Sequence, residues 1–199
     1  MSRNLQTVSL LLAQEGILVD ARSDTGLTPL SLAVSGGNAE IVRRLLAQGP
    51  LVNPDSRSDR GWSPLYIAID HQVDAEIVKL LIDTARVDVN FIDPVSCSTP
   101  LIAAATNNLP DIAQLLVSHP DIDPNLGAHN NQIVPIATAA ARGHTEIREE
   151  IVGMLLADER VGEESRQLLK GQRIFSRRPA LGSYIENGLW WSKMFNSIW

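Results

Sequence analysis

The stretch Thr28-Pro29-Leu30-Ser31-Leu32-Ala33 decides the fold, because its pattern returns three more times along the chain. The later copies are Ser63–Ala68, Thr99–Ala104 and Val134–Ala139, so the pattern recurs every 35 or 36 residues. Proline suits the first turn of a helix, where its missing N–H needs no partner, and a preceding Thr or Ser accepts from free N–H groups. Each copy therefore predicts the start of a short helix.

A second, apolar block follows each copy of the proline pattern. The four blocks are Glu40–Leu46, Glu76–Ile82, Asp111–Val117 and Glu150–Leu156. Apolar residues fall at positions i, i+1, i+4 and i+5 of the block, which builds a broad stripe on one helix face. A single unit cannot bury that stripe alone, so we expect the units to stack into one continuous core.

These segments resemble the ankyrin repeat, whose signature T-P-L-H-x-A lies in a unit of about 33 residues. The resemblance implies an all-α solenoid of stacked helix pairs with β-hairpin or turn fingers, followed here by a C-terminal helical tail. We assign residues 1–161 to the solenoid and residues 162–199 to an extension that packs on it. The expected units are a half-repeat cap at 1–22 and repeats at about 23–57, 58–93, 94–128 and 129–161.

Several positions depart from the family pattern. The signature histidine is replaced in all four copies, so we expect its hydrogen-bond network to be absent; the replacements are Ser31, Tyr66, Ile102 and Ala137. The fourth repeat carries four extra residues before Glu150, which predict a longer inner helix or an added turn. In the cap, residues 4–14 predict one helix with a shared apolar face made of Leu5, Val8, Leu11 and Leu12.

Composition narrows the classes of function. The 199 residues include one cysteine, which excludes an intramolecular disulfide framework and a cysteine-rich zinc site. Their formal charge of −6 argues against nucleic-acid binding. We find no metal or cofactor motif, and no apolar run of the roughly 20 residues that span a bilayer, so integral membrane insertion is not expected. The expected location is the cytoplasm, with the nucleus as an alternative.

The C-terminal extension differs from the repeats in charge and in aromatic content. Residues 1–159 carry 10 Lys and Arg against 20 Asp and Glu, whereas residues 160–199 carry 7 against 3. On a helix the last residues form one apolar stripe, made of Trp190, Trp191, Met194, Phe195, Ile198 and Trp199. Three interpretations stay open: a cover for the last repeat or the concave face, a docking helix for a partner or a second copy of the chain, and a membrane-surface helix.

The family resemblance places contact residues at the finger tips and at the ends of the inner helices. The finger positions are Leu27, Arg60, Trp62, Ser98 and Ile133, and the inner-helix positions are Ser35, Gly36, Asp70, His71, Thr106, Asn107, Ala141 and Arg142. Trp62 is a candidate hot spot, because one indole ring buries a large area at a small entropy cost. The alternative is that Trp62 covers the adjacent finger or receives the tail.

Two hypotheses of function follow from this arrangement. The first is an interaction module that binds a protein partner through the concave face and the finger tips. The second is a cofactor-independent enzyme of the proton-transfer or cyclisation type, or a binder of a small apolar molecule. Its aromatic pocket would be walled by Trp62, Tyr66, Trp190 and Trp191, with Asp70, His71 and Arg142 as candidate catalytic residues. A homodimer formed through the tail is a further alternative.

Overall fold

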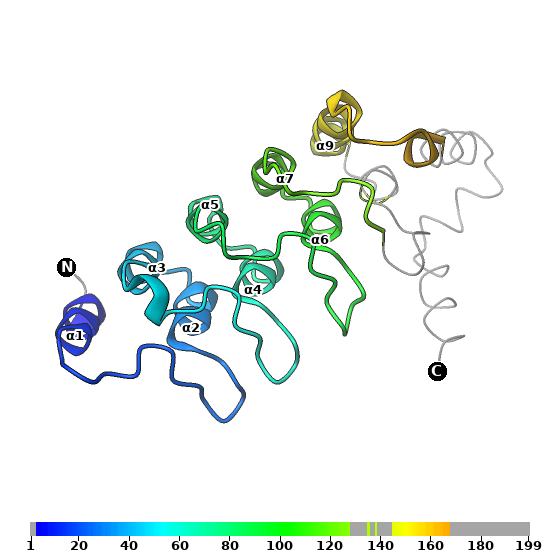
Figure 1. Ribbon diagram of the computed structural model, residues 1–199. Coiled ribbons are helices and arrows are strands. Elements are labelled where there is room, and N and C mark those ends of the chain that lie inside the picture. The colour runs from blue at the N-terminus through cyan, green and yellow to red at the C-terminus, as the bar shows by residue number, and fades with distance from the viewer. Residues whose placement is uncertain (1–2, 128–134, 136–137, 139–144, 168–199) are drawn as a thin grey trace.

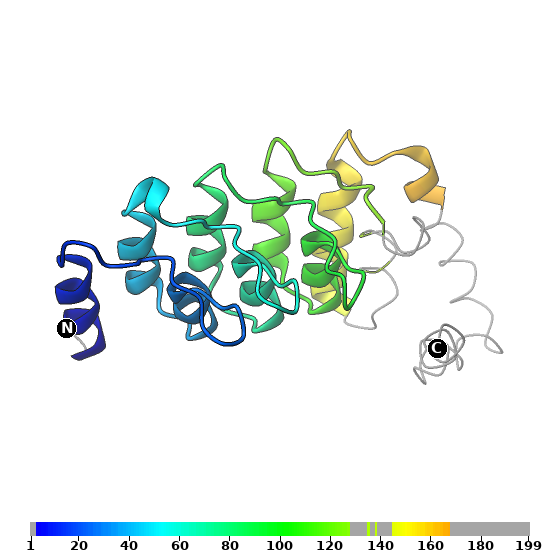
Figure 2. The ribbon, with the colours of Figure 1, turned by 60° about the horizontal axis from the view of Figure 1, so that its bottom comes forward.

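The structure, a computed structural model, describes residues 3–127, 135, 138 and 145–167. Residues 135, 138 and 163–167 are helical, and the eight α-helices and one 3-10 helix that lie wholly within these ranges stack into an elongated solenoid. In chain order they are α1 (Arg3–Leu12), α2 (Pro29–Ser35), α3 (Ala39–Leu46), η1 (Gly49–Leu51), α4 (Pro64–Asp70), α5 (Ala75–Ile82), α6 (Pro100–Thr106), α7 (Pro110–Val117) and α9 (Thr145–Ala157). The inner helices α2, α4 and α6 form one row, and α1, α3, α5, α7 and α9 form an outer row (Figures 1 and 2). The all-α solenoid predicted from the repeat is confirmed.

The inner helices begin where the sequence pattern predicts. The hydroxyl oxygens of Thr28, Ser63 and Thr99 each accept a hydrogen bond from the backbone N–H three residues later, at 3.1–3.2 Å. Proline follows each cap as the first helical residue. The cap satisfies one of the N–H groups that every helix start leaves free, and proline removes another. Local chemistry therefore sets the start of α2, α4 and α6.

The outer helix of the last repeat is longer than the other outer helices. The outer helices α3, α5 and α7 each have 8 residues, whereas α9 has 13. We expected the four extra residues of this repeat to lengthen the inner helix or to add a turn. Residues 145–149 continue directly into the block that begins at Glu150, so the outer helix is longer by about one turn. Apart from residues 135 and 138, the inner helix of this repeat lies outside the described residues, so its length stays a prediction.

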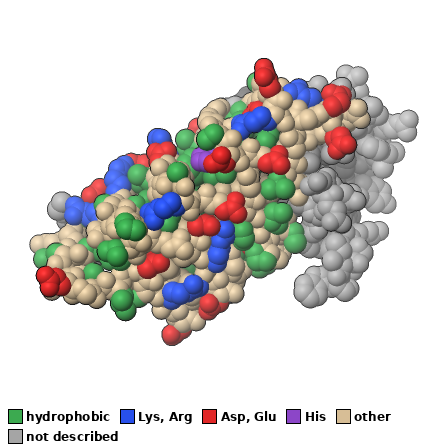
Figure 3. Space-filling view, viewed as in Figure 1, with side chains coloured by type: hydrophobic (Ala, Val, Ile, Leu, Met, Phe, Trp, Pro, Cys, Tyr) green, Lys and Arg blue, Asp and Glu red, His purple; other side chains and the backbone are tan. Residues whose placement is uncertain are grey.

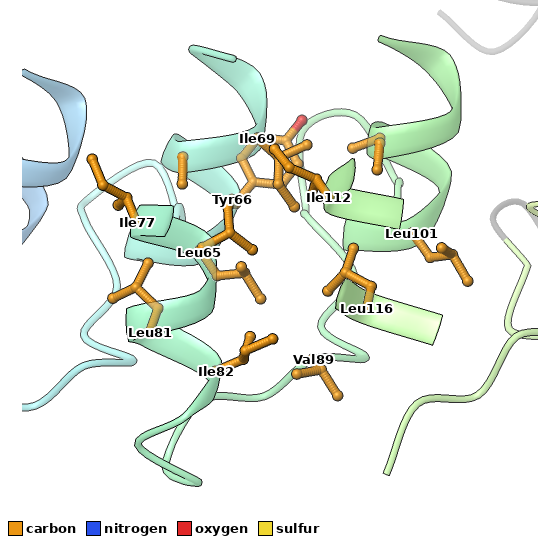
Figure 4. Packing of buried hydrophobic residues seen from close by; sticks show 14 of the residues in the cluster. Leu65, Tyr66, Ile69, Ile77, Leu81, Ile82, Val89, Leu101, Ile112 and Leu116 are labelled. Atoms are coloured by element: carbon orange, nitrogen blue, oxygen red, sulfur yellow. The ribbon is translucent and has the colours of Figure 1, made fainter. Parts of the chain in front are cut away.

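The core runs without interruption through the stack. Leu30, Leu65 and Leu101 occupy the same position in three inner helices and are at most 1% exposed. Each inner helix contacts its own outer helix and the next inner helix, as α4 does with α5 and α6. Figure 4 shows side chains of α4 and α5, including Leu65 and Leu81, filling the space between these helices. Burial of each such leucine contributes about 1.5–3 kcal/mol relative to an exposed one, so neighbouring repeats stabilise one another.

The fingers between the helix pairs are turns. In the second finger, defined here as residues 56–62, the Ser58 N–H donates to Trp62 O at 3.0 Å and the Gly61 N–H to Ser58 O at 2.8 Å. Neighbouring fingers are joined by the Asp59 N–H, which donates to Thr25 O at 3.1 Å. No strand occurs in residues 3–127, so of the two predicted forms, hairpin or turn, the fingers take the turn.

The N-terminal cap is only partly buried. Leu5 is 8% exposed and Leu12 packs against the core, as predicted for one apolar face of α1. The expectation was wrong for Leu11, which is 50% exposed, and its neighbour Leu10 is 61% exposed. The reason is positional: α1 packs on α3 on one side, and no described helix lies on its other side.

Two arginines join successive repeats through backbone carbonyls, and sequence analysis did not single them out. Arg86 donates to Val52 O at 2.9 Å and to Gly49 O at 3.2 Å in the preceding repeat. Arg160, at the end of the last repeat, donates in the same way to four backbone carbonyls of the preceding repeat: Val117 O, His119 O, Pro120 O and Ile122 O. A guanidinium has five donors in a fixed fork, so it satisfies carbonyls that the preceding helix end leaves free.

Within residues 3–127 and 145–167, each helix is too short or too polar to cross a membrane. The C-terminal segment 168–199 lies outside the described residues, so its packing on the solenoid stays a prediction.

Candidate functional site

The predicted contact residues gather at the second finger and along α4. Trp62 directly precedes the Ser63 cap, and its half-buried side chain packs against the core. Its ring centroid lies 6.0 Å from that of Tyr66, with the planes tilted by 38°. Aromatic pairs at this separation attract one another beyond the area that they bury. Tyr66 therefore holds the indole of Trp62 in place at the base of the finger.

Arg60 covers Trp62 from the finger tip. Its guanidinium carbon lies 5.4 Å from the centroid of the Trp62 ring, within the range of a cation–π interaction. The indole Nε1 is buried and has no hydrogen-bond partner in the part of the chain that the structure describes. A buried donor without an acceptor is uncommon, because it loses its bond to water without replacement. The finger thus combines a half-buried aromatic ring with an exposed cation, and the N–H of the ring is buried without a partner among the described residues.

Tyr66 stands where the family signature has histidine. It is 7% exposed, and its hydroxyl lies 2.8 Å from Ser96 Oγ in the next finger. The pKa of Tyr66 is raised above its usual value, chiefly by burial; the carboxylates of Asp93 and Asp70 raise it further, whereas the hydrogen bond with Ser96 opposes the rise. The tyrosine therefore replaces the missing histidine network with a different bond between repeats.

Asp70 and His71 end α4 without facing one another. Both side chains are exposed, and His71 closes the helix through its backbone N–H, which donates to Ile67 O at 3.0 Å. Its imidazole Nδ1 lies 3.1 Å from Ser35 Oγ of the preceding repeat. The Asp70 carboxylate acts instead on Tyr66, through its charge. The arrangement joins neighbouring repeats and does not form a carboxylate–imidazole dyad of the kind used in general base catalysis.

The other predicted positions differ in burial, and some lie outside the described residues. Leu27, Ser98, Thr106 and Asn107 are half-buried, and the Asn107 side chain ties α6 to α4 by donating to Ile69 O at 3.3 Å. Gly36 is exposed at the end of α2. The remaining candidates lie outside the described residues: Ile133, Ala141, Arg142, Trp190 and Trp191. Of the residues expected to wall the aromatic pocket, only Trp62 and Tyr66 are therefore among the described residues.

A second charged cluster, missed by sequence analysis, lies where the second finger meets the following repeat. The Arg57 guanidinium carbon lies 3.4 Å above the Phe91 ring centroid, and its Nη2 lies 2.8 Å from Asp55 Oδ2 and 3.9 Å from Asp88 Oδ2. Burial raises the pKa of Asp55, although the charge of Arg57 opposes the rise. The separation of Arg57 from Phe91 in sequence follows no helical spacing, so no local signal indicated the pair.

Metal chemistry finds no support in the described residues. Among residues 3–127 and 145–167, no three His, Cys, Asp or Glu side chains come together as metal ligands would. The face in Figure 3 carries acidic and basic side chains interspersed with apolar ones.

Comparisons with known proteins agree with this architecture. A family model of ankyrin repeats, three copies long, matches residues 1–93 and again residues 72–164. No curated protein matches the sequence.

Among solved structures, one similar structure is the crystal structure of the ankyrin repeat domain of Bcl-3, described as a unique member of the IkappaB protein family. Its sequence is 26% identical to this chain, and the TM-score is 0.66. The match covers 77% of this chain and 64% of the Bcl-3 chain, so less than two thirds of that chain is represented. The family model spans most of the sequence and the helix pairs follow the same repeat, and the chain therefore belongs to the ankyrin-repeat family.

Proposed function

We propose that this chain is an interaction module that binds a protein partner through its concave face, the side formed by the inner helices and the fingers. Ankyrin repeats generally serve as protein-interaction modules. The single observation that supports the concave face is the second finger, where half-buried Trp62 holds an unpartnered N–H beneath the exposed Arg60. A tryptophan and an arginine at the centre of a surface are the residue types that most often dominate binding energy.

The enzyme hypothesis has less support. Its pocket needs Trp190, Trp191 and Arg142, which lie outside the described residues. Of its other candidates, His71 lies against Ser35 rather than Asp70. We therefore propose recognition, not catalysis, as the role of the concave face.

Site-specific cross-linking tests the proposal. A photo-reactive amino acid replaces Arg60 on the finger, or Lys79, which is equally exposed but lies on outer helix α5. We expect the probe at position 60 to capture a protein from the cell of origin and the probe at position 79 to capture none. The captured protein, purified, should bind the wild-type chain, and Trp62→Ala should weaken that binding at least tenfold with an unchanged circular dichroism spectrum. Capture at position 79 but not at position 60 contradicts the proposal.

A further inference from the structure

Two charges on the second finger and α4 have no ionic partner. Arg60 forms no ion pair and Asp70 forms none, counted over the residues that the structure places. Charges nearby behave differently: Arg22 lies 3.9 Å from Asp59, and Arg57 lies 2.8 Å from Asp55. Because their neighbours are paired, the two charges have no ionic partner to compete with a bound group within the described residues.

The unpaired charges are connected through the aromatic pair. Arg60 stacks on Trp62, Trp62 contacts Tyr66, and Asp70 follows Tyr66 by one helical turn with its charge acting on the tyrosine. This order joins a cation, an indole, a phenol and a carboxylate in one row, named here the finger-two row. It runs from the finger tip to the last residue of α4.

The length of the row determines what fits along it. The two ring contacts measure 5.4 Å and 6.0 Å, and four residues of α-helix add about 6 Å. Because these steps do not lie on a straight line, the two charges are at most about 17 Å apart, which is the length of about five residues of extended chain at about 3.3 Å each.

We propose that the finger-two row binds an extended segment of the partner that carries an acidic residue and, three to five residues away, a basic one. This inference rests on the proposed function and names the chemistry of the segment that the same surface recognises. The acidic side chain pairs with the Arg60 guanidinium, whose fork matches a carboxylate, and the basic side chain pairs with Asp70. Between them, an apolar side chain covers the exposed part of the Trp62 ring.

Each contact has a separate task. The half-buried indole supplies most of the affinity, because the exposed part of its ring leaves water on binding. The two exposed charges select the segment, because a like charge opposite either of them is rejected and an unlike charge speeds association. A segment of uniform charge therefore meets repulsion at one end of the row.

A displayed library of random twelve-residue peptides tests the inference on the full chain. The variants are Trp62→Ala, Arg60→Glu and Asp70→Lys, with Lys79→Glu on the outer helix as a matched charge-reversal control. Each variant is first compared with the wild-type chain by circular dichroism and urea unfolding, so that loss of fold is separated from loss of binding.

We expect the wild-type chain and Lys79→Glu to enrich peptides with one acidic and one basic residue three to five positions apart. Trp62→Ala should reduce enrichment at least tenfold. Arg60→Glu should enrich peptides with two basic residues at that spacing, and Asp70→Lys peptides with two acidic ones. Enrichment of the same peptides by wild type, Arg60→Glu and Asp70→Lys overturns the inference and leaves the proposed function standing. Absence of any enriched peptide also overturns it, whereas the proposed function fails separately, in the cross-linking experiment, which needs no linear peptide.

Discussion

Replacing Leu65 by alanine tests whether the repeats share one core. Leu65 is 0% exposed in the middle of the stack, whereas Leu32, two positions further along in the equivalent helix α2, is 53% exposed. Truncating a buried leucine removes its transfer free energy and leaves a cavity, which together lower the free energy of unfolding by about 2–5 kcal/mol. The same truncation at an exposed position changes it by about 0.5 kcal/mol or less.

Urea unfolding followed by far-ultraviolet circular dichroism separates these values. With a denaturant dependence of about 2 kcal/mol per molar urea, Leu65→Ala should move the midpoint down by about 1–2.5 M, and Leu32→Ala should leave it nearly unchanged. Helices α4, α5 and α6 surround Leu65 and are held by their own neighbours, so the cavity cannot close by collapse of a free element. Equal midpoints for the two variants would refute the continuous core.

Four other contacts can be tested by the same unfolding assay. Arg160→Ala should lower the free energy of unfolding by about 1–3 kcal/mol, because four carbonyls of the preceding turn lose a charged donor; no loss would show that water replaces the arginine. Thr99→Ala should cost about 0.5–2 kcal/mol through loss of the α6 cap, and an unchanged midpoint would contradict the capping role. Gly61→Ala should cost more than about 1 kcal/mol, because its φ is +81° and a Cβ there would lie 2.6 Å from Pro94 Cγ; a neutral result would mean that the finger moves. Since the folded-state pKa of Tyr66 is raised, its contribution to stability should be fully present below about pH 10 and lost as the pH rises through that raised pKa. Tyr66→Phe should remove this alkaline loss, and its persistence in the variant would assign the loss to another group.

The helix starts could be predicted from the sequence because the interactions that set them are local. Thr28, Ser63 and Thr99 cap a backbone N–H only three residues away, so the pattern itself contains both partners. The apolar stripe of the outer helices was predictable for the same reason, since helical spacing is a property of neighbouring residues. The exposure of Leu11 was not, because it depends on whether another helix lies beside α1.

The candidate site was predictable as a set of positions but not as a set of contacts. The repeat register placed Arg60, Trp62 and Asp70 at a finger and a helix end, where the structure finds them. It could not indicate that His71 bonds to Ser35 of the preceding repeat, or that the Tyr66 hydroxyl bonds to Ser96 of the next finger. These partners are 36 and 30 residues apart, and their side chains meet only after the repeats have stacked.

The sequence by itself determined the repeating unit, the helix caps and the family, because each depends on residues within one turn or on a pattern that recurs at a constant spacing. Tertiary structure alone decided which charges are paired, that α9 takes up the extra residues, and that Arg86 and Arg160 join successive repeats. The physical reason is that a guanidinium or an indole finds its partner through space, and stacking determines which groups from different repeats come within reach of a hydrogen bond.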